Sequence, residues 1–341
     1  MEDEILSSFL SLGDEYRILF SRLGNRTAVH AYLISGEKGV GKKTLAGYMA
    51  SALLCKSGNR RPCGVCRNCI LCKNGEHPDL ILIRKGIPIA PGVKKDRTTI
   101  PVEDIREMIR LCGVQSSDGN IHVVLLFDAD KMTPQAQNCL LKTLEEPPPD
   151  TYIILVTDHP ETLLATVKSR CRQHRVKPWT EEYICHTLVH GGTEQNRARE
   201  AASLSNGSIG SAMELSSDDT YWNLREEVLN SFFRVTRRSE ALKISALWKD
   251  RKAEAEQVFG ILESFIGILS ESRFSCDSHT DLSLFPPQWI RFSALAEPER
   301  FVFLVETVSA ARRQVQFSVN FQAIIERIIF VFMGEGNSWL Q

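Results

Sequence analysis

The sequence has almost no net charge, no long apolar run and no internal repeat. Its 41 basic residues balance 42 acidic ones, so the formal net charge is −1. This balance gives no overall signature of nucleic-acid binding, and any contact with DNA must come from a local patch or from partner chains. No apolar stretch approaches the ~20 residues that a membrane-spanning helix needs.

The N-terminus also lacks the features of a secretory signal. Residues 1–5 are acidic, whereas a signal peptide begins with a basic segment followed by an apolar core. With 43% hydrophobic and 24% charged residues, the composition is that of a soluble globular protein. A length of 341 residues suggests two or three domains. We therefore expect a cytoplasmic protein with more than one domain.

A glycine-rich stretch follows the first apolar run and has the form of a phosphate-binding loop. Gly36, Gly39 and Gly41 lie between a predicted buried strand and a predicted helix over Lys42–Cys55. The backbone N–H groups of such a turn point at bound phosphates, and Lys42 adds a point charge. The alternative is a glycine-rich turn that caps an ordinary helix.

The residue after Lys42 does not fit an active phosphate loop. Magnesium is normally held there by a Ser or Thr hydroxyl, but the position is Lys43. Thr44 comes one place later and is turned by about 100° around a helix with ~3.6 residues per turn. An ammonium group in this place would repel a divalent cation. The loop is therefore expected to be able to bind a phosphate but to be poorly equipped to hydrolyse one.

A second departure follows the apolar run at residues 121–127, which is typical of a central parallel strand. In an active ATPase of this kind such a strand ends in Asp-Glu, and the Glu polarises the attacking water. Here Asp128 is followed by Ala129, whose methyl group cannot accept a proton. Asp130 is shifted by two positions. Asp128 can alternatively be a helix N-cap or a loop acid.

Cysteines are concentrated in one short segment, since five of the ten lie between Cys55 and Cys72. This clustering favours a metal over disulfides in an intracellular chain, and four thiolates around zinc form a closed structural site. Cys63, Cys66 and Cys69 follow one another at equal spacing. Cys55 or Cys72 is the fourth ligand, and Cys55 is favoured. The other possibility is a set of free structural cysteines. Basic residues that would offset the thiolate charge are Lys56, Arg60, Arg61, Arg67 and Lys73.

Strand and helix patterns alternate over residues 30–177, which predicts an α/β domain with a parallel sheet. A small helical module follows from residue 179, with a linker predicted at residues 216–219. Residues 221–341 are nearly all helical in pattern, with a break at Pro286 and Pro287.

Several of these segments resemble AAA+ clamp-loader subunits of bacterial DNA polymerase III. The most specific are residues 138–148 and 163–171, together with residues 30–33 before the loop and the cysteine cluster after the first helix. The resemblance implies an ATPase-like domain over 1–177 with a zinc module near 55–72. A helical lid over 178–217 and a helical collar over 218–341 would follow it.

The resemblance also separates two types of subunit, one that hydrolyses ATP and one that does not. The family places a sensor arginine in the lid within a Gly-Ser-x-Arg pattern. Residues 207–210 end in Gly210 instead. The magnesium hydroxyl, the catalytic Glu and the sensor arginine are thus all replaced. This favours a non-hydrolysing stator, and the alternative is an active motor of the gamma/tau type.

By the same resemblance, Arg170 in the Ser169–Arg170–Cys171 motif is an arginine finger that reaches the ATP site of a neighbouring subunit. The alternative is a surface arginine that pairs with an acid. The implied partners are the gamma/tau and delta subunits and, through the assembly, the sliding clamp and primed DNA. The chain would be a non-catalytic subunit of a nucleotidyltransferase holoenzyme. Structural Zn²⁺ is expected, and ATP or ADP binding is left open. A zinc-dependent nucleic-acid-binding module is a third hypothesis.

Overall fold

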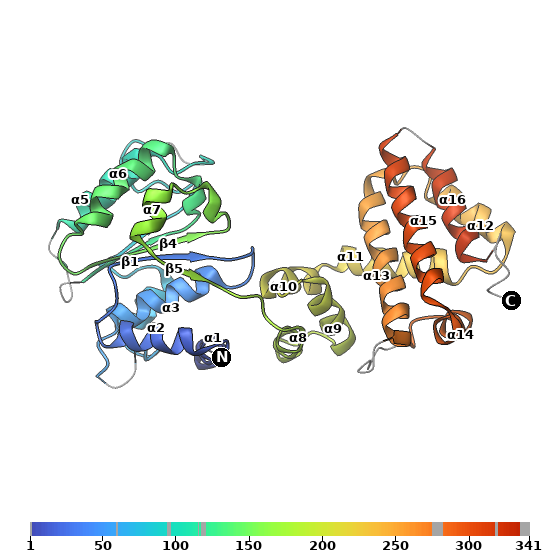
Figure 1. Cartoon of the computed structure of the whole chain (residues 1–341), viewed down its shortest axis with the longest axis horizontal. Helices are drawn as coiled ribbons and strands as arrows, with labels where there is room; N and C mark the ends of the chain where they lie inside the picture. The colour runs from blue at the N-terminus through green and yellow to red at the C-terminus, as the bar shows by residue number, and fades with distance from the viewer. Residues whose placement is uncertain are drawn as a thin grey trace. The chain divides into compact units, whose positions relative to one another are not determined.

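The computed structural model describes residues 2–58, 61–93, 97–114, 116, 121–274, 282–317 and 320–334. The chain divides into two compact units, Met1–Ser216 and Ser217–Gln341 (Figure 1). The predicted basic residue Arg60 lies outside the described residues. Within the described part, no helix is long and apolar enough to cross a membrane.

The first unit contains a five-stranded sheet with the order β2-β3-β4-β1-β5, and all four strand pairings are parallel. The predicted α/β domain with a parallel sheet is therefore confirmed. Strand β1 lies between β4 and β5, with Leu33 opposite Leu155 and Gln173. The strands are β1 (Ala31–Ser35), β2 (Leu80–Ile83), β3 (His122–Leu126), β4 (Thr151–Thr157) and β5 (Arg172–Arg175).

Helices cover both faces of this sheet (Figure 1). Helices α5 (Val102–Cys112), α6 (Pro134–Glu145) and α7 (Ala165–Arg170) lie on one face. Helices α2 (Asp14–Gly24) and α3 (Lys42–Leu54) lie on the other, next to α1 (Glu2–Ser11). Burial on both faces explains why β1, β3 and β4 read as apolar runs without alternation.

The core under α5, α6 and α7 contains side chains that recur at helical spacing. Ile105, Met108 and Cys112 of α5 and Leu140 and Leu144 of α6 all belong to one buried cluster with the sheet. This is the spacing that predicted α5 over residues 102–112, and the helix has those bounds. Short elements complete this part of the unit: α4 (Arg67–Asn74) and the 3-10 turns at Ala129–Lys131 and Pro160–Thr162.

Three helices close the first unit: α8 (Glu181–His190), α9 (Gln195–Leu204) and α10 (Ile209–Ser217). The division between the two units falls inside the linker predicted at residues 216–219, but most of that segment is helical. Helix α10 runs through Ser217 and α11 begins at Asp219. The Asp218 carboxylate accepts hydrogen bonds from the backbone N–H groups of Thr220 and Tyr221, so the connection between the units is short and includes the N-cap of α11.

The second unit is helical throughout its described residues. Its helices are α11 (Asp219–Val228), α12 (Arg238–Leu247), α13 (Ala255–Phe274), α14 (Pro287–Leu295), α15 (Pro298–Gln316) and α16 (Phe321–Phe332), with a π-helical segment at Leu229–Phe233 and a 3-10 turn at Lys252–Glu254. Pro287 is the first residue of α14, which accounts for the predicted break.

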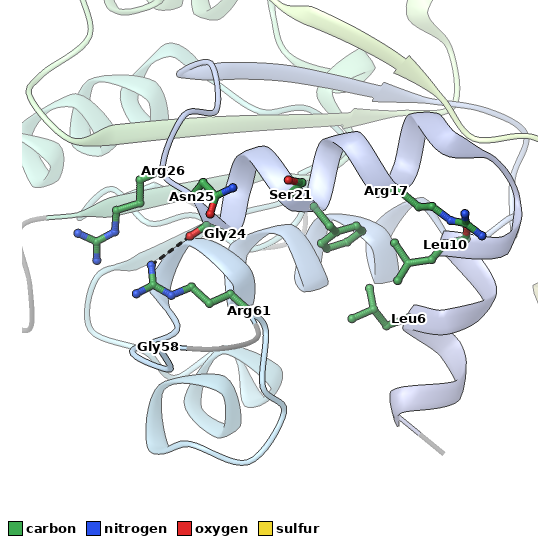
Figure 2. A pocket seen from close by; sticks show the side chains of 10 residues that line it. Leu6, Leu10, Arg17, Ser21, Gly24, Asn25, Arg26, Gly58 and Arg61 are labelled. Atoms are coloured by element: carbon green, nitrogen blue, oxygen red, sulfur yellow. Dashed lines mark hydrogen bonds between the residues drawn. The ribbon is translucent and has the colours of Figure 1, made fainter.

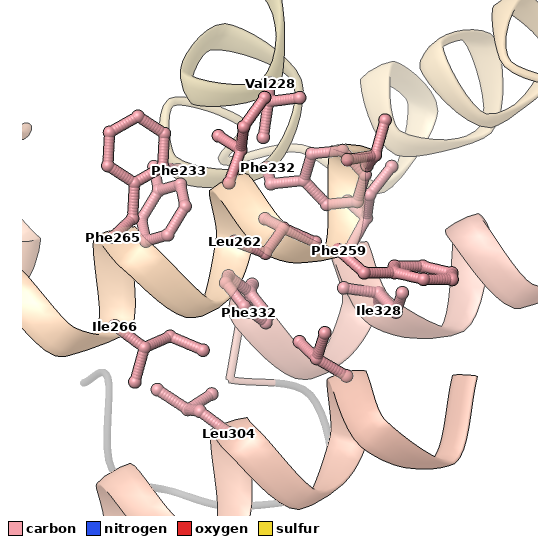
Figure 3. Packing of buried hydrophobic residues seen from close by; sticks show 14 of the residues in the cluster. Val228, Phe232, Phe233, Phe259, Leu262, Phe265, Ile266, Leu304, Ile328 and Phe332 are labelled. Atoms are coloured by element: carbon pink, nitrogen blue, oxygen red, sulfur yellow. The ribbon is translucent and has the colours of Figure 1, made fainter. Parts of the chain in front are cut away.

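An aromatic core holds this unit together (Figure 3). The ring centroid of Phe233 lies 5.3 Å from Phe265, 4.8 Å from Trp289 and 5.1 Å from Phe332. These residues come from four separate segments, so one side chain ties together helices distant in sequence. Edge and tilted ring contacts of this kind add to the free energy of apolar burial.

Candidate functional site

The phosphate loop lies between β1 and α3 and depends on glycine for its backbone. Gly39 and Gly41 have φ values of 80° and 94°, a region that favours glycine, and Gly41 is the N-cap of α3. The loop therefore has the strand–turn–helix setting in which backbone N–H groups can face an anion. That it binds phosphate stays a prediction.

Lys42, the point charge of the loop, is already paired. Its ammonium group lies 2.8 Å from a carboxylate oxygen of Asp158 and also donates to the carbonyl of Glu37. The side chain is only 5% exposed. Asp158 follows β4, the strand that pairs with β1, and was not predicted from the sequence. An acid directly after this strand was the signal, because parallel neighbours end at the same edge of the sheet.

Lys43, the second residue of α3, pairs with the acid that follows β3. Its ammonium group is 3.3 Å from Asp128 Oδ1 and lies over the ring of Phe127, 5.5 Å from the centroid. Asp128 thus has a tethered cation as its partner. Thr44 is exposed on the next position of α3.

Ala129 is fully buried, and neighbouring Asp130 is held by other groups. Lys131 lies 2.9 Å from Asp130 Oδ2, and the Thr157 hydroxyl donates to Oδ1 at 3.0 Å. Burial acts to raise the pKa of Asp130, but the hydrogen bonds from Lys131 and Thr157 outweigh it and lower the pKa. A carboxylate stabilised in this way is a weak general base.

Gly210, at the start of α10, lies directly against the phosphate loop. The Gly210 N–H donates to the Gly39 carbonyl at 2.9 Å, and the Ser208 hydroxyl donates to the Lys38 carbonyl at 2.9 Å. Gly210 therefore lies at a contact between two backbone segments. That it stands in place of a sensor arginine stays a prediction.

Four cysteines converge beside α3. The sulfur atoms of Cys55, Cys63, Cys66 and Cys69 all lie within 4.8 Å of one another, and the Cys55–Cys66 and Cys63–Cys69 pairs are each 3.9 Å apart. Tetrahedral zinc with Zn–S bonds of ~2.3 Å requires sulfur atoms about 3.8 Å apart. The donor set and its spacing therefore fit one zinc ion.

Backbone amides support this cluster. The N–H groups of Ser57, Cys66 and Cys69 point at the sulfurs of Cys55, Cys63 and Cys66 at 3.4–3.5 Å. Burial works to raise the pKa of the Cys66 thiol, but the Cys69 N–H and the neighbouring thiols lower it to about 6. Such N–H···S contacts favour a thiolate, the form that binds a metal.

Cys72, the alternative fourth ligand, is buried but lies outside the group of four. Burial raises the pKa of its thiol to about 12. The structure thus brings Cys55 to the three equally spaced cysteines. The role of all four as ligands stays a prediction.

Arg170 ends helix α7 and is paired within the chain. Its guanidinium donates from Nε to Glu145 Oε1 at 2.8 Å, and Nη2 reaches the same oxygen. Nη1 donates to the Thr166 carbonyl at 3.0 Å. The side chains of Arg170 and Glu145 are 34% and 48% exposed. Beside Arg170, Ser169 bonds within its own helix and Cys171 is buried, which raises the pKa of its thiol to about 12.

A glycine loop between a strand and a helix, placed at the carboxyl edge of a five-stranded parallel sheet, defines a P-loop α/β domain. Comparison with known proteins makes the class more specific. A family model described as "DNA polymerase III, delta subunit" matches residues 14–180. The chain is 31% identical to the delta-prime subunit of Haemophilus influenzae DNA polymerase III over 255 residues, covering 74% of each chain.

Two further relatives are also subunits of DNA polymerase III. The delta-prime subunit of Bacillus subtilis (strain 168) is 29% identical over 322 residues, which is 92% of this chain and 94% of that one. The tau subunit of Escherichia coli (strain K12) is 37% identical over 176 residues, covering 51% of this chain and 26% of tau. The chain belongs to the delta-prime family of DNA polymerase III clamp-loader subunits.

Proposed function

We propose that this chain is a non-hydrolysing stator subunit of a DNA polymerase III clamp loader and supplies an arginine finger to a neighbouring ATPase subunit. Its partners in this role are gamma/tau and delta subunits in the cytoplasm. Through the assembly it acts on the sliding clamp and primed DNA. The ATPase-like domain, lid and collar correspond to residues 1–177, 178–217 and 218–341.

The Lys43–Asp128 ion pair is the observation that carries the stator role. A carboxylate that would support magnesium has an ammonium group as its partner instead. Magnesium neutralises charge on the phosphates during phosphoryl transfer, and a water-positioning residue orients the nucleophile. Ala129 cannot perform the second task. Together with Gly210, these residues argue against turnover at the chain's own site.

The geometry of Arg170 supports a role in trans. Its pair with Glu145 is partly exposed, and exposed ion pairs contribute only about 0–1 kcal/mol. A phosphate group from a neighbour could therefore replace Glu145 at little cost. A guanidinium near the γ-phosphate stabilises developing charge and accelerates hydrolysis by ~10³–10⁵ in some systems.

The role of the cysteine cluster in this proposal is structural. Cys55, Cys63, Cys66 and Cys69 would hold Zn²⁺ with four protein ligands, which leaves no open position for water. The bound ion supplies folding free energy to the segment and no chemistry. Asn68 donates to the Leu54 carbonyl at 2.9 Å and joins this segment to the end of α3.

The decisive experiment measures ATPase rates with the isolated chain and with a reconstituted assembly. We expect no steady turnover by the isolated chain. Arg170→Ala should leave assembly intact and abolish hydrolysis at one partner site, with poor rescue by Arg170→Lys because lysine lacks the planar fork. Arg172→Ala, an exposed arginine two residues away, is the matched control.

Two results would overturn the proposal. Turnover by the isolated chain, abolished by Lys42→Ala, would favour the gamma/tau-type motor. Clamp-stimulated turnover equal to wild type in the Arg170→Ala assembly would leave Arg170 as a surface arginine paired with Glu145.

A further inference from the structure

Three segments of the first unit close around the phosphate loop. They are the N-terminal helix α1, the stretch after β5, and the start of α10. Each contacts a different residue of the loop, and each contact restricts the loop in a separate way.

The start of α10 touches the loop backbone to backbone. A Cβ atom added at Gly210 would lie 3.0 Å from Gly39 Cα and 3.1 Å from its carbonyl oxygen. A Cβ added at Gly39 would lie 2.3 Å from the Ser208 hydroxyl. With the hydrogen bonds from Gly210 and Ser208, this contact requires glycine on both sides. It also explains physically why the lid position holds no larger side chain.

Aromatic side chains fix the next residues of the loop. The buried indole of Trp179 donates to the Val40 carbonyl at 3.0 Å. Phe9 of α1 is 1% exposed, and its ring lies 5.2 Å from that of Trp179. A Cβ added at Gly41 would lie 3.1 Å from the Phe9 ring, so Phe9 is in contact with the N-cap of α3.

The charge of the loop is engaged as well. Lys42, which would meet a phosphate, is bound to Asp158 and to the Glu37 carbonyl. The carbonyls of Lys38, Gly39 and Val40 all accept hydrogen bonds from outside the loop. The loop is therefore held from several sides by the chain itself.

We propose that α1 and the start of α10 form an intramolecular clamp, distinct from the sliding clamp, that holds the phosphate loop closed. The loop binds a nucleoside diphosphate only when this intramolecular clamp is released. This inference rests on the proposed stator function and adds to it. The replaced catalytic groups explain why the chain would not hydrolyse ATP, whereas the clamp explains why its lid would stay in one position.

The surroundings of α1 leave space for release. An open hollow of about 600 Å³ borders α1 and separates Leu6 and Leu10 from Gly58 and Arg61 (Figure 2). Helix α1 therefore has solvent space along part of its length and is not enclosed in the core. A loop that is competent only when the clamp opens has its apparent affinity reduced by the open fraction.

The test uses fluorescent ADP with the full chain, in magnesium-free buffer without chelator, so that binding does not depend on magnesium and the cysteine cluster keeps its metal. The clamp variant combines Phe9→Ala with Ser208→Ala. Ser216→Ala is the matched control, because the Ser216 hydroxyl bonds to Met213 within the same helix. We expect the clamp variant to bind at least about tenfold more tightly than wild type and the control to be unchanged. Adding Lys42→Ala to the clamp variant should abolish binding.

Hydrogen exchange of the amides in residues 36–42 gives a second readout, and it should be faster in the clamp variant. If that variant fails to fold, Gly210→Ala pushes on Gly39 without removing a core side chain. Equal ADP affinity in the wild type and in a folded clamp variant would overturn the clamp. ATP turnover by the wild type would instead overturn the stator function, so the two failures are distinguishable.

Discussion

The phosphate-loop region and the cysteine cluster both gather groups that bind cations, but the two regions balance the negative charge of those groups differently. Beside the loop, Asp128 and Asp130 are paired with the ammonium groups of Lys43 and Lys131. In the cluster, four thiols face one another, and backbone N–H groups approach their sulfurs. A tethered lysine can replace a metal ion where charge is all that matters. Four converging cysteines would need one cation that binds all four together if they are to be thiolates.

The largest expected effect comes from breaking the cysteine site. Cys66→Ser should reduce bound zinc from about one ion per chain to less than half and unfold the segment around it. Structural zinc contributes an apparent ~10–16 kcal/mol in small zinc domains, so the loss of even part of it is severe. Metal analysis of protein purified without chelator, with thermal unfolding, measures both effects.

Cys72→Ser is the control for this substitution, because Cys72 is buried nearby but outside the group of four. It should keep its zinc. The ligand set is wrong if Cys72→Ser loses zinc while Cys55→Ser retains it.

A smaller effect is expected at Asp130. Asp130→Asn should lower stability at pH 7 by about 1–2 kcal/mol, because it weakens hydrogen bonds to a charged group. The folded pKa of Asp130 is lowered, so its contribution is complete above the unfolded pKa of ~3.9 and is lost as pH falls through the folded value. The stability difference from wild type should therefore be constant between pH 7 and about pH 5 and shrink below about pH 4.

Urea unfolding at several pH values measures this difference. Asp14→Asn removes a carboxylate from an exposed pair with Arg17 and should change stability much less. A difference at Asp130 that grows on acidification would contradict the assigned pairing.

The smallest effect tests whether Lys43 replaces a metal. Lys43→Thr leaves Asp128 without its ammonium partner and restores a hydroxyl at the start of α3. Thermal stability of this variant should rise by a degree or two with millimolar Mg²⁺, while the wild type should not respond. Lys38→Thr, on the same loop, is the control. An equal response in all three proteins would show that Lys43 does not substitute for the ion.

Local patterns in the sequence predicted most of the framework. The glycines at 36, 39 and 41, the apolar strands and the spacing of α5 are set by neighbours in the chain, and they appear where expected. Partners distant in sequence were missed. Asp158 beside Lys42 is indicated only by its place directly after β4, and Glu145 beside Arg170 is an exposed acid without a local pattern. Their positions depend on which strands and helices pack together.

Strand β5 was missed for a related reason. Its four residues are polar, with Arg172, Gln173 and Arg175 exposed, so the segment has no apolar alternation. It forms because its backbone pairs with β1 from Tyr32 to Ser35. A strand of this kind is recognised from the sheet it joins and not from its own composition.

That short basic strand also determines how the sheet ends. An edge strand presents unpaired backbone groups that can recruit a strand from another molecule and start aggregation. Four residues with two exposed arginines make a poor template, because a second copy would bring like charges into register. This edge of the sheet, which begins two residues after Arg170, can therefore stay exposed even where several copies of the chain are close together. The like charges therefore disfavour edge-to-edge growth of the sheet, while the exposed side chains of β5 remain accessible.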